Sequence, residues 1–383
     1  MKRIFKICTT VLVAGSLLGL AGCANKPVNN RVSTLANWNP KTSATVESNF
    51  YTEWQTKKEV IEYDVSFDKG ANTNYDVIYD TDNAEYKTEF YMEAEYDWKS
   101  ELIPENYRST AEGKDVEPVY VYKSTRRVAV TYDLKDGSTP QTFEDVLQTV
   151  CKFRTAGNNL QPVYSEQIDK NTSPNTPSAT SYNGLFIRTD RVCTTYYNKG
   201  CTAATVYEID NTVNESQKEP VEIAINNKEN YSVFDNSEIL AAMRGFAMLS
   251  SSGGGSSSTF HIVAPQNKNS ALCRASVAAP AELNPENAEQ KQIIDALNSS
   301  DGYIYFDPAE PEGDEKAKNI RYSSVTLSMV ADLSGASNSY WYTTLENADI
   351  NATKCVMVRG VTPLSFNLGN LRYTLKSISK VDI

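Results

Sequence analysis

The chain has 383 residues, a formal net charge of −11 at pH 7 and 40% hydrophobic residues. That length allows one large domain or two smaller ones, and the hydrophobic content is enough to build a core. The acidic balance repels polyanions, so nucleic acid is not an expected partner. The single histidine excludes a multi-histidine zinc site, so neither a metal nor a cofactor is expected.

The first residues have the order of an export signal. A basic start, "MKRIFK", precedes an apolar run from 7 to 20 that is too short to cross a bilayer comfortably. The run ends in "LAGC", which resembles the bacterial lipoprotein cleavage motif. The resemblance implies that residues 1–22 are a signal peptide, that Cys23 carries the lipid, and that the domain is held outside the cytoplasm at a membrane or cell surface.

The segment after the signal is polar. Residues 23–48 contain Pro27 and Pro40 and have no apolar period, which is typical of a flexible tether. Residues 49–383 are expected to form a single β-rich domain, because short strand patterns and turn residues follow one another closely. The first predicted strands are residues 60–67, 75–80, 85–98, 118–124 and 127–134.

Residues 85–98, "EYKTEFYMEAEYDW", alternate between apolar and acidic side chains. Strict alternation predicts a half-buried strand with one face on a core and the carboxylates in water, and therefore an antiparallel sheet. The apolar face either packs as core against helices, which we favour, or lines an incompletely filled groove that binds an acyl chain or an apolar part of a ligand. Its candidate ligand-binding residues are Tyr86, Phe90, Met92, Tyr96 and Trp98.

The middle of the chain continues the strand pattern. Residues 140–154 fit helical and strand spacing equally well, and residues 160–168, 182–197, 201–209, 219–225 and 229–234 are predicted strands. Cys193 and Cys201 flank a turn-like stretch between two of these strands. A disulfide across that hairpin is geometrically possible, although two small buried residues are slightly favoured.

Two helices are predicted. The first begins at "DNSEILAAMRGFAML", where Asp235 and Glu238 form a capping box, and the second spans residues 285–297 with Asn284 as its cap. A glycine-serine loop at 250–258 separates the first helix from a strand at 259–265. Further strands are predicted at residues 302–307, 319–333, 338–345, 353–359 and 370–380.

"LQPVYSEQ", several strands, and the "DNSEILAAMRGF" helix leading into "STFHIVAP" resemble bacterial proteins of the half-open β-barrel type. That superfamily includes the lipoprotein carriers and related, mostly uncharacterised envelope lipoproteins, and the resemblance covers residues 140–265. It implies a strongly curved antiparallel sheet with about two helices packed on its concave face. In some members that face holds acyl chains.

Catalytic motifs are weak. His261 alternates with Phe260 and Ile262, which indicates a strand residue with a satisfied ring, and there is no nucleophile elbow, P-loop or dinucleotide fingerprint. The acidic stretch 307–315 could attract Ca²⁺ but is better explained as an exposed loop. Arg244 is expected to pair within the fold.

We therefore predict a surface lipoprotein without catalytic activity that binds a lipid or another apolar ligand. A glycan-binding or protein-binding adhesin is the alternative, and a hydrolase built on paired carboxylates is a third hypothesis.

Overall fold

The structure is a computed structural model, and the description below is confined to part of the chain. The signal segment, the tether, Trp98, the predicted strand at 302–307 and the acidic stretch 307–315 lie outside the described residues. The described ranges are 57–71, 76–97, 116–133, 137, 139–156, 159–171, 189–211, 216–227, 231–247, 256–299, 321–329, 337–344, 356–364 and 368–383.

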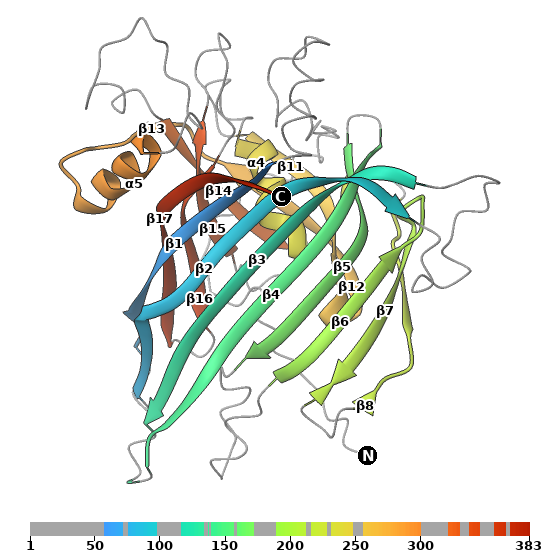
Figure 1. Cartoon of the computed structure of the whole chain (residues 1–383), viewed down its shortest axis with the longest axis horizontal. Helices are drawn as coiled ribbons and strands as arrows, with labels where there is room; N and C mark the ends of the chain where they lie inside the picture. Colours follow the sequence, from blue (N-terminus) through green and yellow to red (C-terminus); the bar gives the residue numbers. More distant parts are fainter. Residues whose placement is uncertain are drawn as a thin grey trace, which may run out of the picture.

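Strands dominate the described residues and form one strongly curved sheet, which confirms the predicted fold class (Figure 1). One arm of the sheet runs through consecutive antiparallel strands from β1 to β7, with β8 and β9 paired to β7. Its strands are β1 (Lys57–Lys69), β2 (Asp76–Asp97), β3 (Val116–Asp133), β4 (Gln141–Ala156), β5 (Asn159–Asn171), β6 (Thr189–Tyr197), β7 (Ala203–Asp210), β8 (Ser216–Gln217) and β9 (Val221–Ala224).

The other arm begins where β1 pairs with the last strand, and it runs back through the C-terminal half. Its antiparallel ladder continues from β17 through β16, β15, β14 and β12 to β11, with β13 paired to β14. The strands are β10 (Val233–Asp235), β11 (Ser256–Ala264), β12 (Asn269–Val277), β13 (Ala281–Glu282), β14 (Arg321–Met329), β15 (Ser337–Thr344), β16 (Met357–Leu364) and β17 (Gly369–Asp382).

Several predicted strands are longer than their local pattern suggested. The predictions at 75–80 and 85–98 belong to the single strand β2, and those at 118–124 and 127–134 belong to β3. Register shifts in β2 between Asp80 and Glu85 and between Glu93 and Tyr96 absorb the irregular residues without ending the strand. The ambiguous segment 140–154 lies within β4, because its alternate residues pair with β3 and β5.

The edge strand β10 differs from the predicted antiparallel arrangement, because it pairs with β11 in parallel. Side chains connect this end of the sheet to β5, β6 and β7 of the other arm. Asp235 in β10 accepts hydrogen bonds from Ser165 in β5, at 2.6 Å, and from the hydroxyl of Tyr197 in β6. Lys268, which precedes β12, forms an ion pair of 2.7 Å with Glu208 in β7. The sheet therefore closes into a barrel-like shape through side chains at this seam.

The two helices lie on opposite faces of the sheet. The 3-10 turn η3 (Asn236–Glu238) leads into α4 (Ile239–Ala247), which packs on the concave side against β14 and β15 (Figure 1). Helix α5 (Ala288–Asn298) contacts Asp64 and Thr374, whose sequence neighbours Tyr63 and Tyr373 point into the core. Because neighbouring strand residues face opposite sides, α5 covers the outer face. The expectation that both helices pack on the concave face is wrong for α5.

The predicted start of α5 is also wrong by three residues. Asn287, not Asn284, is the N-cap, and its side chain accepts from the Gln290 amide at 3.1 Å. Asn284 instead accepts from the Glu286 amide at 2.9 Å, which holds a turn before the helix. At the first helix, Asp235 accepts from the Ser237 amide at 2.7 Å, as its capping role predicts.

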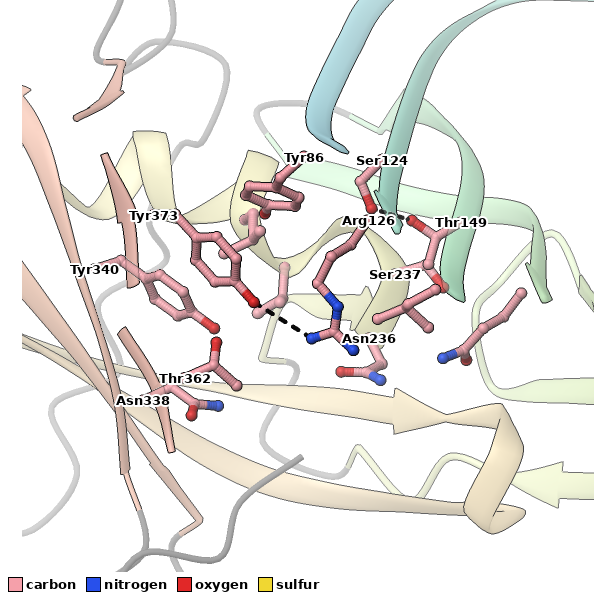
Figure 2. Close-up of a pocket in the computed structure, with 14 residues that line it drawn as sticks. Tyr86, Ser124, Arg126, Thr149, Asn236, Ser237, Asn338, Tyr340, Thr362 and Tyr373 are labelled. Atoms are coloured by element: carbon pink, nitrogen blue, oxygen red, sulfur yellow. Dashed lines mark hydrogen bonds between the residues drawn. The ribbon is translucent and has the colours of Figure 1, made fainter. Parts of the chain in front are cut away.

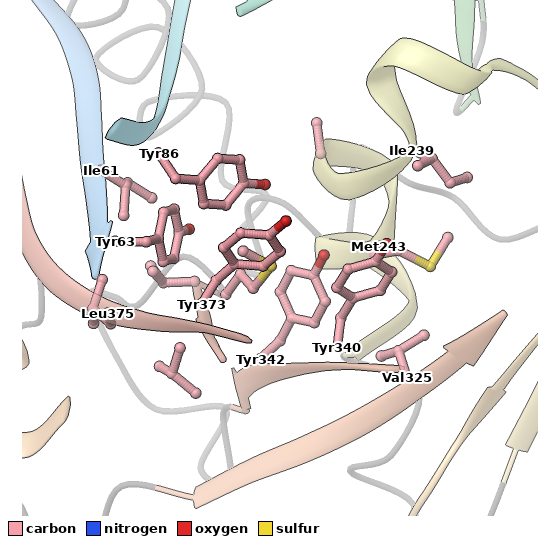
Figure 3. Close-up of a cluster of buried hydrophobic side chains, with 14 of the residues drawn as sticks. Ile61, Tyr63, Tyr86, Ile239, Met243, Val325, Tyr340, Tyr342, Tyr373 and Leu375 are labelled. Atoms are coloured by element: carbon pink, nitrogen blue, oxygen red, sulfur yellow. The ribbon is translucent and has the colours of Figure 1, made fainter. Parts of the chain in front are cut away.

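Tyrosines fill much of the space between α4 and the sheet (Figure 3). The rings of Tyr86 and Tyr373 lie 4.3 Å apart between centroids, and those of Tyr63 and Tyr86 lie 5.0 Å apart. The hydroxyl of Tyr342 donates to the carbonyl of Leu240 in α4 at 2.9 Å. Each ring thus buries apolar area, and its hydroxyl can still find a polar partner in the interior.

Phe90 and Met92 belong to this core, with 2% and 4% of their surface exposed. Phe90 stacks on Tyr120 and Phe153, at centroid distances of 5.7 and 6.1 Å. The favoured prediction that these two residues are core is therefore confirmed. Tyr96 pairs with Glu117 in the ladder between β2 and β3, and its side chain lies outside the described part.

The acidic side of β2 is less solvated than predicted. Glu89 forms an ion pair of 3.2 Å with Lys58 in β1, and 16% of its side chain is exposed. Glu93 forms an ion pair of 2.6 Å with Lys152 in β4, and 32% of its side chain is exposed. Lysines from neighbouring strands therefore cover carboxylates that the alternation alone assigns to water.

The possible disulfide between Cys193 and Cys201 is not formed. Both cysteines are in the reduced form and buried, with 2% and 3% of the residue surface exposed. They pack in a separate apolar cluster with Tyr197 near the seam. The preferred interpretation, two small buried residues, is confirmed.

Candidate functional site

A polar patch interrupts the apolar inner face where β3, β4 and β5 meet. Arg126 in β3 lies opposite Tyr86 in β2 and Leu147 in β4. Because side chains alternate along a strand, the side chain of Arg126 points into the barrel. Thr149 and Gln167, opposite each other in β4 and β5, continue this patch on the same face. All three polar side chains are buried, with 6% of the surface of each residue exposed.

A cavity of about 100 Å³ lies between this patch, η3, the start of α4 and the inner faces of β15 to β17. Figure 2 shows the oxygens of Tyr340, Tyr373 and Thr362 on one side of this space and the polar ends of Arg126 and Asn236 on the other. Residues that line the cavity are Tyr86, Ser124, Arg126, Leu147, Thr149, Gln167, Asn236, Ser237, Ile239, Leu240, Asn338, Tyr340, Thr362 and Tyr373.

Arg126 is held by two hydrogen bonds from its terminal nitrogens. One nitrogen donates to Asp145 Oδ1 at 3.1 Å, and the other donates to the Tyr373 hydroxyl at 3.3 Å. Burial raises the pKa of Asp145, and the neighbouring guanidinium acts in the opposite direction. Burial also disfavours the charged form of Arg126, but Asp145 and Tyr373 hold its pKa well above the ordinary value. The positive charge at the cavity is thus already paired.

Four polar atoms of residues that line the cavity have no hydrogen-bond partner among the described residues: Arg126 Nε, Gln167 Oε1, Ser237 Oγ and Asn338 Oδ1. They come from β3, β5, η3 and β15, and only 6%, 6%, 8% and 3% of the respective residue surfaces are exposed. Buried polar atoms are nearly always hydrogen-bonded, because desolvation without a partner costs about 1–3 kcal/mol each. All four atoms belong to residues that line the same cavity.

Asp169 in β5 lies beside this patch and faces Arg191 in β6 at 3.8 Å. Burial raises the pKa of Asp169 to about 6, and Asp145 adds to the effect while Arg191 opposes it. The carboxyl is protonated in both the folded and the unfolded chain below about pH 4, and it is ionised in both above about pH 7.

This raised pKa predicts that the free energy of unfolding falls by up to about 3 kcal/mol between pH 4 and 7 on account of Asp169. Urea unfolding across that range should show a smaller fall for Asp169→Asn than for the wild type. Asp382→Asn, which alters an exposed carboxyl at the end of β17, is the control and should follow the wild type. Identical pH profiles for all three proteins would contradict the assignment.

The predicted ligand residues divide between core and cavity. Tyr86 lines the cavity, whereas Phe90 and Met92 pack in the core away from it. The sequence analysis did not identify Arg126, Gln167 or Asn338. For Arg126 the sequence did contain a signal. It lies an even number of residues from Tyr120 and Tyr122 in β3, whose side chains point into the barrel, so it places a charge on an otherwise aromatic face.

Other candidate groups serve the fold. Arg244 in α4 pairs with the buried Glu59 of β1, as expected of a residue that pairs within the structure. His261 is a strand residue whose pKa burial lowers, but its Nδ1 has no partner among the described residues, so the predicted satisfied ring is not observed. The described ranges contain neither a cluster of three metal-ligating side chains nor a helix long and apolar enough to span a membrane.

Comparison with known proteins yields a distant structural likeness. No family model matches the sequence, and no curated protein matches it. A solved β-barrel-like protein of a domain of unknown function, DUF1849, from Brucella abortus is similar with a TM-score of 0.39 and 7% sequence identity. The match covers 85% of this chain and 98% of that chain. Any statement about function therefore depends on the geometry of this molecule.

Proposed function

We propose that this chain is an exported, lipid-anchored binding protein that encloses a small ligand in the cavity beneath α4 and performs no catalysis. The observation that carries the proposal is that four buried, unpartnered polar atoms belong to residues that line that cavity. A bound molecule would supply the missing hydrogen bonds, and the apolar walls from Ile239 and Leu240 would cover the rest of its surface.

The chemistry of the lining favours binding over hydrolysis. Among the described residues, the cavity wall contains hydroxyls, side-chain amides and an ion-paired guanidinium, but no carboxylate, cysteine or histidine. A glycosidase needs two carboxylates that flank the scissile bond, and nucleophilic catalysis needs an activated nucleophile beside a base. The wall as described offers hydrogen bonds and shape alone.

The size of the cavity argues for a small guest instead of an acyl chain. Pockets for drug-sized ligands are about 300–1,000 Å³, whereas this cavity has about 100 Å³. The tyrosines and α4 occupy the concave face on which a lipid would lie. We therefore assign the lipid to the anchor at Cys23 and a smaller molecule to the interior.

An adhesin finds weaker support. Tyr164, Tyr196 and Tyr207 form a row on the outer face of β5 to β7, but their rings meet edge to face at 5.4 and 5.8 Å. A sugar stacks on an open ring face, and Tyr196 is only 7% exposed. The row packs against itself more than it presents a platform.

Native mass spectrometry of protein extracted in mild detergent tests the binding proposal. The wild type should carry a non-covalent adduct that is lost on denaturation, and Gln167→Leu should carry less of it. Gln148→Leu is the matched control, because Gln148 lies in β4 on the face opposite the cavity. A wild type free of any adduct, with no small molecule released on denaturation, would refute enclosure of a ligand.

Anchoring has its own test. Metabolic labelling with a fatty acid is expected to mark the wild type, because the resemblance to a lipoprotein signal places an acylated cysteine at position 23. Cys23→Ala should remove the label and release the protein from the membrane fraction. Equal labelling of the two proteins would contradict lipidation at this residue.

A further inference from the structure

We infer that the ligand of this cavity is a small uncharged molecule with an amide-type group, that is, N–H donors and a carbonyl acceptor on one planar head. The inference rests on the proposed function, because it takes the cavity to be a binding site. It specifies the class of molecule from the hydrogen-bonding capacity, charge and size of the wall.

Hydrogen-bonding capacity comes first. Gln167 Oε1 and Asn338 Oδ1 are acceptors and require donors from the guest, whereas Arg126 Nε carries a hydrogen and requires an acceptor. Ser237 Oγ is a hydroxyl that can either donate or accept, so it does not change this requirement. An amide supplies both from adjacent atoms. The Tyr340 hydroxyl shares a hydrogen bond with Thr362, so this pair closes the opposite side without adding an unpaired donor. A carboxylate, which only accepts, would leave both amide oxygens unsatisfied.

Charge points the same way. Arg126 is paired with Asp145, and Arg191 faces Asp169 next to it. Asp235 adds a buried acidic group that accepts from Ser165 and Tyr197 close to η3. The three acidic residues outnumber the two arginines, so the site offers no net positive charge to an anion. A cation would need a carboxylate in the wall, and the described lining has none. Burying an unpaired charge is costly, so a neutral guest fits best.

Size restricts the ligand further. An apolar cavity of about 150 Å³ is known to hold benzene, and liquid water takes about 30 Å³ per molecule. The 100 Å³ available here therefore suits a guest of only a few heavy atoms. Leu147, Ile239 and Leu240 provide an apolar wall for a short alkyl group attached to the amide head.

Three probes of similar size separate the possibilities: propionamide, propionate and propylammonium. Ligand-observed NMR on the wild type should give a dissociation constant for propionamide at least about tenfold lower than for either ion, as expected for about one hydrogen bond and an avoided charge burial. Propionate or propylammonium binding as tightly as propionamide would overturn the inference.

Variants locate the binding. Asn338→Leu and Gln167→Leu each remove an acceptor that has no partner in the described structure. Each change should raise the dissociation constant for propionamide about tenfold. Gln148→Leu should leave its affinity unchanged. Equal weakening by the control would overturn the site. The ranking of the three probes on the wild type remains decisive if a variant does not fold.

The two proposals fail differently. A retained adduct in native mass spectrometry together with no binding of propionamide refutes the amide class and leaves enclosure of a ligand standing. If the wild type carries no adduct and binds none of the three probes, both proposals are refuted, and the cavity then holds ordered water only. Binding of propionamide by the wild type and its loss in Asn338→Leu supports the inference.

Discussion

Replacing Phe90 with alanine is expected to lower the free energy of unfolding by about 3–5 kcal/mol, as measured by urea or thermal unfolding of the soluble domain. The ring is 2% exposed and stacks on both Tyr120 and Phe153, so its removal loses burial and leaves a void in the core. The loss is a large part of the 5–15 kcal/mol that typically stabilises a domain.

The comparison for this result is Glu93→Gln on the opposite face of the same strand. Its ion pair with Lys152 is partly exposed, and pairs of this kind contribute about 0.2–1 kcal/mol. We expect the glutamate change to cost no more than that. If Glu93→Gln destabilises the domain more than Phe90→Ala, the assignment of the two faces of β2 is wrong.

Arg244→Met is expected to cost about 3–5 kcal/mol, because it leaves Glu59 buried and unpaired beneath α4. The side chains of Arg244 and Glu59 are 9% and 1% exposed, so water cannot replace the lost partner. The double variant Arg244→Met with Glu59→Leu should recover most of the loss, since removing both charges also removes their desolvation cost.

An exposed pair provides the control for this experiment. Arg127 contacts Glu144 at 3.1 Å on the outer face, and about half of each side chain is exposed. Arg127→Met should change stability by less than about 1 kcal/mol. A double variant of Arg244 and Glu59 that is as unstable as the single variant would show that the two residues contribute separately.

Local pattern predicted the parts of the fold in which one face of a strand is buried. Alternation placed Phe90 and Met92 in the core, because the apolar side chains recur at every second position of β2 and share one face of the strand. It did not reveal that Lys58 and Lys152 cover Glu89 and Glu93, since those lysines belong to other strands and only the register brings them close.

Features set by long-range packing were harder to predict. The outer position of α5 depends on contacts with Asp64 and Thr374, which precede it by more than two hundred residues and follow it by about eighty. The parallel pairing of β10 with β11 requires the intervening α4 to cross the concave face, which no local pattern specifies. The predicted positions of strands and helices along the chain therefore agree with the structure better than their predicted arrangement in space.

The cavity shows the same limit. Arg126, Gln167 and Asn338 come from strands that are distant in sequence, and each by itself reads as a surface residue or a satisfied polar group. Their burial becomes visible only when the sheet curves and η3 covers β4 and β5. The single local signal of an inward polar residue was in β3, where the alternation of side chains places Arg126 on the same face as Tyr122.

The pairing of the first described strand with the last determines when the domain can complete its fold. β1 and β17 join residues as far apart in sequence as Lys57 and Asp382, which lie 325 positions from each other. Contacts of such separation slow folding because a long loop must close before they form. A chain made from its N-terminus therefore holds β1 with one open edge until β17 has emerged, and an open edge is a site of aggregation. Loss of this fourteen-residue strand would leave both β1 and β16 without that partner, so β17 protects two strand edges at once.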